Sequence, residues 1–337
     1  MIAVLKQGTT ATQRENLIQW LSAQGLVVHV SEGAYKTVLG LVGDTSKIDM
    51  DLLSGLEIVD QVTRISEPFK SANRKFHPDD TVVTAEASKI GGGHFGLIAG
   101  PCSVESEEQI CTVAKAVKAA GATFLRGGAF KPRTSPYDFQ GMGAEGIELL
   151  LKAKAATGLP IVTELMSISH IDLFADVDVI QVGARNMQNF EMLKELGRCN
   201  KPILLKRGMS ATLKEMLMSA EYIMAGGNEQ VILCERGIRS FETNTRFTLD
   251  LCGVAWLKEH CNLPIILDPS HAMGYAYGIG DLARACTAMG VDGLLIETHP
   301  CPECAQSDAP QQLNHQQFAE MYTSLQPIAA AVGKNLV

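Results

Sequence analysis

Four residues of types that bind divalent metals lie at or just after short apolar runs. Cys102 follows the run LIAGP, His271 follows PIILDPS, and Glu297 lies in GLLIETHP. The fourth residue, Asp308, comes eleven positions after Glu297, in QSDAPQ. A thiolate, an imidazole and two carboxylates form a mixed donor set that lies between the preferences of zinc and those of manganese or iron. The sequence therefore predicts a site for one divalent metal ion and leaves the identity of that metal open. The alternative is that Cys102 is an inert buried thiol and His271 a core histidine.

Cationic residues form a second group at the ends of such runs. The chain has 29 Lys and Arg against 37 Asp and Glu, so we expect no nucleic-acid or membrane-surface role, and these cations must act locally. They are Arg126, Lys131, Arg133, Arg185, Lys206 and Arg236. Cations gathered at one end of a set of strands favour the binding of a small polyanion with phosphate or carboxylate groups. The alternative for each residue alone is a neighbouring acid or an exposed position.

The apolar runs themselves recur eight times after residue 96. They span 97–103, 123–128, 160–167, 179–185, 202–208, 230–237, 264–271 and 293–300. Amphipathic stretches such as TLKEMLMSAEYIMAGG separate them. Eight strand–helix units predict a (β/α)8 TIM barrel with its chemistry at the C-terminal ends of the strands; the alternative is an open doubly wound sheet. Because strands eight and one are neighbours in a closed barrel, we expect the four candidate ligands to converge.

The N-terminal residues follow a different pattern. Residues 1–66 carry apolar and helical runs in the order βαββαβ, which predicts a small ferredoxin-like domain. Residues 67–96 lose this periodicity, contain two prolines and run through three consecutive glycines. We expect a connector with a short hairpin there. The predicted domains are therefore 1–66, 67–96 and the catalytic barrel 97–337.

The nine cysteines are scattered along the chain, unlike the disulfide framework of a small secreted protein. No 18-residue apolar stretch and no signal-peptide pattern occurs, so we expect a cytoplasmic protein without membrane insertion. Cys301 and Cys304 form one C-x-x-C pair, and no second pair completes a structural zinc site. Because this pair lies between Glu297 and Asp308, our hypothesis is that its oxidation disturbs the loop between them.

Seven segments together resemble one enzyme family. They are LIAGPCSVES, LRGGAFKPRTSPYDFQG, QVGARNMQNF, LLKRGMSATLKE, ILCERGIRSFE, LDPSHAMG and IETHP with SDAPQ. They resemble the 3-deoxy-D-arabino-heptulosonate 7-phosphate (DAHP) synthases, and among these the type I beta subgroup with an N-terminal ferredoxin-like regulatory domain. The resemblance implies a barrel that condenses phosphoenolpyruvate with erythrose 4-phosphate, the first committed step toward chorismate and the aromatic amino acids.

The resemblance also implies roles for the residues at the strand ends. One divalent metal ion per subunit, Mn2+ or else Fe2+, Co2+ or Zn2+, would be held by Cys102, His271, Glu297 and Asp308. Phosphoenolpyruvate would be held by Arg126, Lys131, Arg185, Lys206 and Arg236. The aldose phosphate would be held by Arg133, Thr134 and Ser135. The two phosphates and the carboxylate of these substrates account for the clustered cations.

Two further residues are candidates for proton transfer. We expect Lys131 to protonate the developing alkoxide, because a Lys among other cations can have a lowered pKa. Glu164 is a candidate to assist the water that adds to the substrate, and the alternative is that it holds a neighbouring Lys or Arg. The resemblance further implies an aromatic amino acid effector at the N-terminal domain and a homotetramer. The alternative for residues 1–66 is a stabilising appendage or an oligomer contact.

Three other functions fit parts of the sequence. A 3-deoxy-D-manno-octulosonate 8-phosphate synthase would use a five-carbon aldose phosphate, but that family resembles KANRS where this chain has KPRTS. A non-catalytic sensor of an anionic metabolite would not need four metal ligands. A scaffold built around zinc has only the one C-x-x-C pair in its favour.

Overall fold

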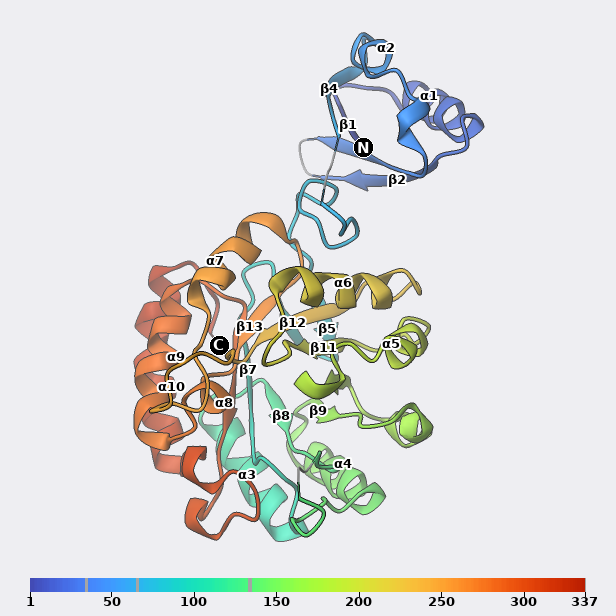
Figure 1. Ribbon diagram of the computed structural model, residues 1–337. Helices are drawn as coiled ribbons and strands as arrows, with labels where there is room; N and C mark the ends of the chain where they lie inside the picture. Colours follow the sequence, from blue (N-terminus) through green and yellow to red (C-terminus); the bar gives the residue numbers. More distant parts are fainter. Residues whose placement is uncertain (34–35, 65–66, 133–134, 337) are drawn as a thin grey trace. The chain divides into compact units, whose positions relative to one another are not determined.

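The computed structural model describes residues 1–33, 36–64, 67–132 and 135–336. It consists of two compact units (Figure 1). The first comprises Met1–Asp80 with Glu259–Asn262, and the second comprises Thr81–Lys258 with Leu263–Val337. The predicted domain limits 1–66, 67–96 and 97–337 stay predictions, because a compact unit need not coincide with a domain that folds by itself. Among the described residues, no helix is both long and apolar enough to cross a membrane.

The N-terminal unit has the predicted ferredoxin-like fold. Its elements are β1 (Ile2–Leu5), α1 (Ala11–Ala23), β2 (Val27–Glu32), β3 (Thr37–Val42), α2 (Met50–Ser54) and β4 (Val59–Thr63), with a short 3-10 turn, η1 (Thr45–Lys47), before α2. The antiparallel sheet has the strand order β2-β3-β1-β4. Leu17 of α1 and Leu53 of α2 belong to one buried cluster with Leu39 and Leu41 of β3. Both helices therefore cover the same face of the sheet.

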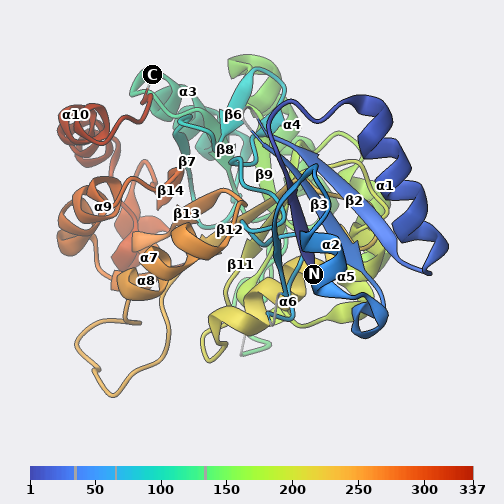
Figure 2. The ribbon, with the colours of Figure 1, turned by 90° about the horizontal axis from the view of Figure 1, so that it is seen from above.

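The second unit is a closed parallel barrel, as the eight apolar runs predict. Its strands are β7 (Gly96–Gly100), β8 (Phe124–Arg126), β9 (Ile161–Glu164), β10 (Val179–Val182), β11 (Ile203–Lys206), β12 (Val231–Glu235), β13 (Ile265–Leu267) and β14 (Gly293–Glu297). The ring closes where β14 pairs with β7. Helices surround it (Figures 1 and 2). They are α3 (Glu107–Ala119), α4 (Ala144–Thr157), α5 (Phe190–Leu196), α6 (Leu213–Met224), α7 (Leu251–His260), α8 (Pro269–Met273), α9 (Ile279–Ala288) and α10 (His315–Ala331).

The barrel interior is a packed apolar core. Side chains from all eight barrel strands, among them Ile98, Phe124, Leu204 and Leu295, form one buried cluster. The hairpin β5 (Val83–Ala85) and β6 (Ser88–Ile90) adds Val83, Ala85 and Ile90 to the same cluster. A side chain at Gly96, where β7 begins, would meet Ile90 at 2.6 Å. The hairpin expected in the connector therefore packs at the N-terminal end of the barrel and leaves the opposite end open for chemistry.

One glycine lets β7 and β8 approach each other beside the site. Gly100 has φ of +154°, and a Cβ built there would lie 1.9 Å from the carbonyl oxygen of Arg126. A side chain cannot be accommodated against backbone at that distance. Cys102 therefore follows β7 directly beside the end of β8.

Candidate active site at the C-terminal end of the barrel

The four predicted metal ligands come together in the folded chain. One ligand atom from each of Cys102, Glu297 and Asp308 lies within 4.8 Å of the other two. His271 Nε2 lies 3.5 Å from Glu297 Oε1 and 3.9 Å from Asp308 Oδ2. Residues more than 200 positions apart in the sequence thus present sulfur, nitrogen and oxygen donors to one small volume.

Each donor is positioned by a different element. Cys102 follows β7 and Glu297 ends β14, so the closure of the barrel places them side by side. His271 lies in the first turn of α8, whose N-cap Asp268 accepts a hydrogen bond from the His271 backbone N–H. Asp308 begins the 3-10 turn η6 (Ala309–Gln311) in the left-handed conformation, with φ of +52°.

Burial and neighbouring charges act in opposite directions on the pKa values of the acids in this cluster. Burial alone would raise the pKa of Glu297, but Arg126, and His271 when its ring is protonated at low pH, outweigh burial and keep this pKa below its ordinary value. Burial would likewise raise the pKa of Asp308, and His271 and then Arg246 lower it instead. Burial raises the pKa of the Cys102 thiol to about 11. Two carboxylates and a protonated thiol therefore face one another in this cluster.

The donor set fits a divalent metal ion. The Nδ1 atom of His271 lies 2.7 Å from Asp268 Oδ2, which leaves Nε2 facing Glu297 and Asp308. A carboxylate behind a histidine is the usual outer partner that orients an imidazole toward a metal. Burial lowers the pKa of His271, which favours the neutral, ligating form of the ring. The residues present therefore meet the chemical requirements of the site predicted from the sequence.

Two of the predicted anion-binding cations are paired with buried acids. Arg126 Nη1 lies 2.6 Å from Glu297 Oε1, and Lys206 Nζ lies 2.5 Å from Asp268 Oδ2. All four side chains are at most 5% exposed. The alternative of a neighbouring acid thus applies to these two residues in this structure. Arg126 lies against Glu297, a predicted ligand, and Lys206 lies against Asp268, the carboxylate beside the His271 ring.

Arg236 has the properties of a free anion-binding group. It follows β12 and is 5% exposed, and its guanidinium lies 4.1 Å from the centre of the Phe247 ring. Within the described part of the chain, its Nη1 atom has no hydrogen-bond partner. Burial lowers the pKa of Arg236. A buried guanidinium with an unused donor is costly without a ligand, so this position favours an anion.

Lys131 lies against the metal cluster. Its ammonium Nζ is 3.0 Å from Cys102 Sγ and 3.0 Å from the Cys102 carbonyl oxygen. A side chain added at Gly128 would come within 3.2 Å of the same Nζ. The segment after β8 therefore folds back so that the Lys131 cation reaches the end of β7.

The remaining predicted residues lie in three different situations. Arg185 is exposed and lies in the 3-10 turn η3 (Ala184–Asn186). Ser135 is half-buried, and its hydroxyl accepts a hydrogen bond from the backbone N–H of Tyr137. Arg133 and Thr134 lie outside the described residues. The described contacts thus do not join Arg185 or Ser135 to the metal cluster.

Glu164 is the last residue of β9 and points beside β10. Its Oε2 atom accepts a hydrogen bond from Gln181 Nε2 at 3.2 Å. A Cβ at Gly183 would lie 1.9 Å from Glu164 Oε1. Glycine at position 183 therefore leaves the space that the carboxylate of Glu164 occupies.

Sequence reasoning missed two side chains that complete the cluster. Arg246, in the loop between β12 and α7, lies 3.1 Å from Asp308 Oδ2 and donates to Gln311 Oε1 at 2.7 Å. Gln311 in turn donates to Glu297 Oε2 at 2.6 Å. Gln311 could have been noticed three positions after Asp308. Arg246 follows no strand, so no local signal marks it.

The C-x-x-C pair is a disulfide in this structure. Cys301 and Cys304 are bonded, with Cα atoms 5.3 Å apart. In the same structure Cys102, Glu297 and Asp308 are converged. The bonded pair coexists with the assembled cluster in this structure, and the hypothesis that oxidation disturbs this loop stays a hypothesis.

Both parts of the chain match known families. Residues 1–67 match the DAHP synthase ferredoxin-like domain, and residues 80–332 match the DAHP synthetase I family. The chain belongs to the DAHP synthetase I family. It is therefore an enzyme of the DAHP synthase class with an N-terminal ferredoxin-like domain, as the motifs predict.

Individual relatives agree with this family. A phospho-2-dehydro-3-deoxyheptonate aldolase from Thermotoga maritima is 44% identical over 334 residues, which cover 99% of each chain. A crystal structure of such an aldolase (DAHP synthase) from the same organism matches with a TM-score of 0.79 at 43% identity, over 99% of this chain and 98% of that one. A 2-dehydro-3-deoxyphosphooctonate aldolase from Syntrophotalea carbinolica is 31% identical, over 76% of this chain and 98% of its own.

The buried pair of Lys206 and Asp268 generates a stability prediction. Asp268→Asn leaves the buried Lys206 cation without its acid, and we expect a loss of about 3–5 kcal/mol in the free energy of unfolding. Urea unfolding followed by circular dichroism measures this. Asp281→Asn is the matched control, because Asp281 pairs with Arg284 at the surface and its side chain is 80% exposed; its cost should stay within about 0.5 kcal/mol. Equal effects of the two substitutions would contradict the assignment.

Proposed function

We propose that this protein condenses phosphoenolpyruvate with erythrose 4-phosphate and water to give DAHP and phosphate, the first step of the shikimate pathway. The observation that carries the proposal is the similarity to DAHP synthase over 99% of both chains, together with the converged donors at the barrel mouth. We also propose that the enzyme is a cytoplasmic homotetramer, on the basis of the family alone.

We propose that Cys102, His271, Glu297 and Asp308 hold one divalent ion, Mn2+ in the first place and Fe2+, Co2+ or Zn2+ as alternatives. When bound, such an ion is a Lewis acid that polarises the aldehyde oxygen of erythrose 4-phosphate. Arg126 and Gln311 keep the Glu297 carboxylate oriented through bonds of 2.6 Å each. The chain therefore supplies a site in which the ligands are already in position.

The cations at the C-terminal ends of the barrel strands are proposed to bind and orient phosphoenolpyruvate. Arg236 offers its unpaired Nη1 donor to a phosphate or carboxylate oxygen. The other cations proposed for this substrate are Arg126, Lys131, Arg185 and Lys206. For the phosphate of the aldose we propose Arg133, Thr134 and Ser135. Neutralisation of these anions lets two substrates that repel each other approach.

Lys131 is proposed as the proton donor. C3 of phosphoenolpyruvate forms a bond to the aldehyde carbon, and the resulting alkoxide takes a proton from the Lys131 ammonium. The position of Nζ, 3.0 Å from Cys102 Sγ, supports this role because it lies beside the proposed metal ligands. The new bond uses the electrons of the C2–C3 double bond, which leaves C2 electron-poor. Water then adds at C2 and its protons pass to the departing phosphate, while the bond from C2 to the phosphate oxygen breaks and the C2 oxygen from water becomes the ketone. Glu164, with its half-buried carboxylate on the same rim, is proposed to orient that water.

Phosphate release tests this function. Purified protein treated with EDTA is mixed with phosphoenolpyruvate and either erythrose 4-phosphate or arabinose 5-phosphate, before and after Mn2+ is added. We expect phosphate release only with Mn2+ and erythrose 4-phosphate, because the aldehyde must be polarised and the KPRTS segment resembles the family that uses the four-carbon aldose. Release with arabinose 5-phosphate alone would assign the octulosonate reaction of the 31% identical relatives instead.

Two variants separate the metal from the proton donor in this assay. Cys102→Ala should abolish turnover and reduce bound Mn2+. Lys131→Met should lower turnover by about 10²- to 10⁴-fold, the usual contribution of a general acid, while bound Mn2+ stays at the wild-type level. Near-normal turnover of Lys131→Met would remove this residue from the mechanism.

The pKa directions in the cluster predict how metal binding depends on pH. The Cys102 thiol has a pKa of about 11, so between about pH 7 and 9 it must lose a proton to bind metal. The lowered pKa values of Glu297, Asp308 and His271 leave these groups with no proton to lose in that range. Affinity for Mn2+ should therefore rise about tenfold per pH unit, with one proton released. Calorimetry in buffers of different protonation enthalpy measures both quantities.

The control for this linkage is Cys102→Ser, in which no thiol titrates. Its weaker Mn2+ affinity should be nearly independent of pH over the same range. A flat pH dependence of the wild-type protein would show that Cys102 is not a ligand.

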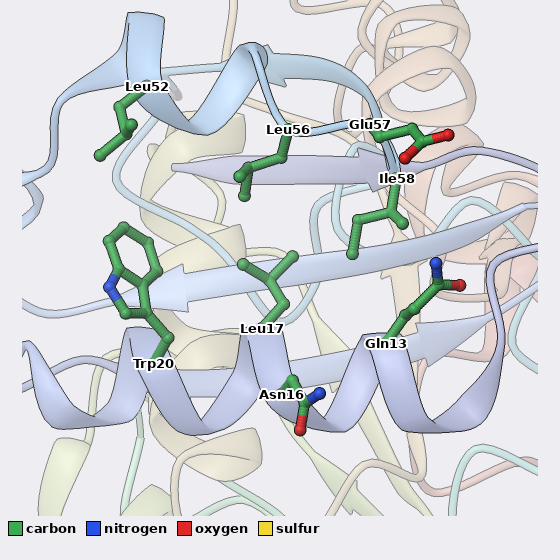
Figure 3. A pocket seen from close by; sticks show the side chains of 8 residues that line it. All are labelled: Gln13, Asn16, Leu17, Trp20, Leu52, Leu56, Glu57 and Ile58. Atoms are coloured by element: carbon green, nitrogen blue, oxygen red, sulfur yellow. The ribbon is translucent and has the colours of Figure 1, made fainter.

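The N-terminal domain is proposed to bind an aromatic amino acid effector. A cavity of about 460 Å³ lies between α1 and the segment that runs from α2 to β4 (Figure 3). Leu17 and Trp20 face Leu52, Leu56 and Ile58 across it. The polar groups at its edge come from Gln13, Asn16 and Glu57. Apolar walls with a few polar groups suit the ring and the charged end of an amino acid.

Inhibition assays on the full chain test the effector. We expect phenylalanine, tyrosine or tryptophan to inhibit DAHP formation, and Trp20→Ala to raise the inhibition constant by about 10-fold or more, because an aromatic wall of the cavity is lost. Val30→Ala is the control, since Val30 is a 40% exposed apolar residue that does not line the cavity. Absence of inhibition by all three amino acids, or unchanged inhibition of Trp20→Ala, would contradict the proposal.

A further inference from the structure

The disulfide lies within the loop that joins two of the proposed metal ligands. Cys301 is four residues after Glu297, and Cys304 is four residues before Asp308. The bond closes the short turn η5 (Pro302–Cys304). Cys304 is exposed and Cys301 is half-buried, so the bond can be reached from solvent. Seven other cysteines are free thiols, and Cys102 among them is fully buried.

A buried histidine connects the disulfide turn to both sides of the metal cluster. The backbone N–H of Cys301 donates to His299 Nδ1 at 3.1 Å. The Nε2 atom of His299 lies 3.4 Å from Glu105 Oε2 without a hydrogen bond, so the two groups are close neighbours. The other oxygen of Glu105 accepts hydrogen bonds from the Gln306 backbone and the Ser103 hydroxyl. The turn is therefore joined, through one histidine and one carboxylate, to the neighbours of Cys102 and Asp308.

Asp308 depends on such support. It and Glu86 are the non-glycine residues with positive φ in the described part of the chain. A left-handed conformation of this kind costs free energy and persists only where surrounding structure holds it. Ser307, one residue earlier, lies 3.1 Å from Cys102 Sγ. Freedom gained by the loop before Asp308 would therefore be felt directly at the cluster.

We propose that Cys301 and Cys304 form a redox modification site at which a dithiol reductant opens the disulfide and thereby weakens divalent-metal binding at the barrel mouth. The proposal rests on the metal site of the proposed function. It assigns to the bonded form the assembled cluster that the structure contains, and to the reduced form a looser loop between Glu297 and Asp308.

The exchange is balanced by the reductant. A thiolate of the dithiol attacks the exposed Cys304 sulfur, a mixed disulfide forms, and Cys301 leaves as a thiolate that takes up a proton. The second thiol of the reductant then attacks its own sulfur in the mixed disulfide and releases Cys304 as a thiol. Two electrons and two protons pass from the dithiol to the protein, and the reductant ends as a disulfide.

The size of the effect follows from the ring that the bond closes. A disulfide that closes a ring of four residues lowers the conformational entropy of the loop only modestly. After reduction, metal binding must order this loop itself, and the free energy that this costs is at most the entropy that the disulfide removed. We expect the dissociation constant for Mn2+ to rise by about 3- to 20-fold on reduction. Mn2+ is the suitable probe, because softer ions would bind the liberated dithiol itself.

The experiment compares two forms of the same full-length protein. One sample is oxidised and one is reduced with a phosphine, and both are treated with EDTA and desalted without oxygen. Thiol titration after denaturation should find seven free thiols in the first sample and nine in the second. Mn2+ binding is then followed by electron paramagnetic resonance, and hydrogen exchange of residues 298–308 is measured without metal. We expect weaker Mn2+ binding and faster exchange in the reduced form, and recovery of both after reoxidation.

Variants check that the effect comes from this pair. A Cys301→Ser, Cys304→Ser double variant should bind Mn2+ like the reduced protein and should not respond to the phosphine. Cys252→Ser is the matched control, because Cys252 is an exposed free thiol on α7, and it should keep the full response.

Several outcomes would overturn the proposal. Nine free thiols after mild oxidation would show that the bond does not form. Equal Mn2+ affinity and equal hydrogen exchange in the two forms would show that the loop does not depend on it. If neither form binds Mn2+, the proposed metal site fails, and the redox proposal, which needs that site, fails with it. Redox-independent Mn2+ binding with full DAHP synthesis would overturn the redox proposal alone.

Discussion

The site depends on the compensation of buried charge at the mouth of the barrel. Glu297 and Asp268 are fully buried carboxylates, and each lies within 2.6 Å of a buried cation. A buried charge without a partner is strongly destabilising, so the four side chains have little freedom to turn away from one another. Arg126 thereby orients Glu297, one proposed metal ligand. Lys206 holds Asp268, the carboxylate that lies beside the ring of His271, another proposed ligand. The same pairs that permit burial of these groups also preorganise them for catalysis.

This constraint changes the interpretation of the cations. A simple count of strand-end cations suggests repulsion that only a bound anion could relieve. In the structure, Arg126 and Lys206 already have acidic partners, whereas the buried Nη1 of Arg236 has none among the described residues. Two cations thus hold buried acids, while Arg236, with its Nη1, and Arg126, with its Nε, keep buried donors that have no partner among the described residues. An anion that reached Arg126 or Lys206 would share them with the acids.

The barrel and the convergence of its ligands could be predicted because both follow from periodicity. Eight apolar runs are enough to close a ring, and closure brings Cys102 beside Glu297 whatever the loops do. The ion pairs could not be predicted, because Arg126 and Glu297 are 171 positions apart and side-chain direction chooses the partner. Arg246 lies in a loop without periodicity, and only the folded chain shows that it meets Asp308. The bonding of the C-x-x-C pair could not be predicted either, since the sequence does not show that a bonded turn is compatible with the converged ligands.

The most direct test of the account is a crystal structure of the protein with Mn2+ and phosphoenolpyruvate, in which the anomalous scattering of manganese locates the ion. The account predicts one strong peak within coordination distance, about 2.0–2.6 Å, of Cys102, His271, Glu297 and Asp308, with an oxygen of phosphoenolpyruvate bonded to Arg236. A peak at any other group of residues, or phosphoenolpyruvate bound away from Arg236, would contradict it.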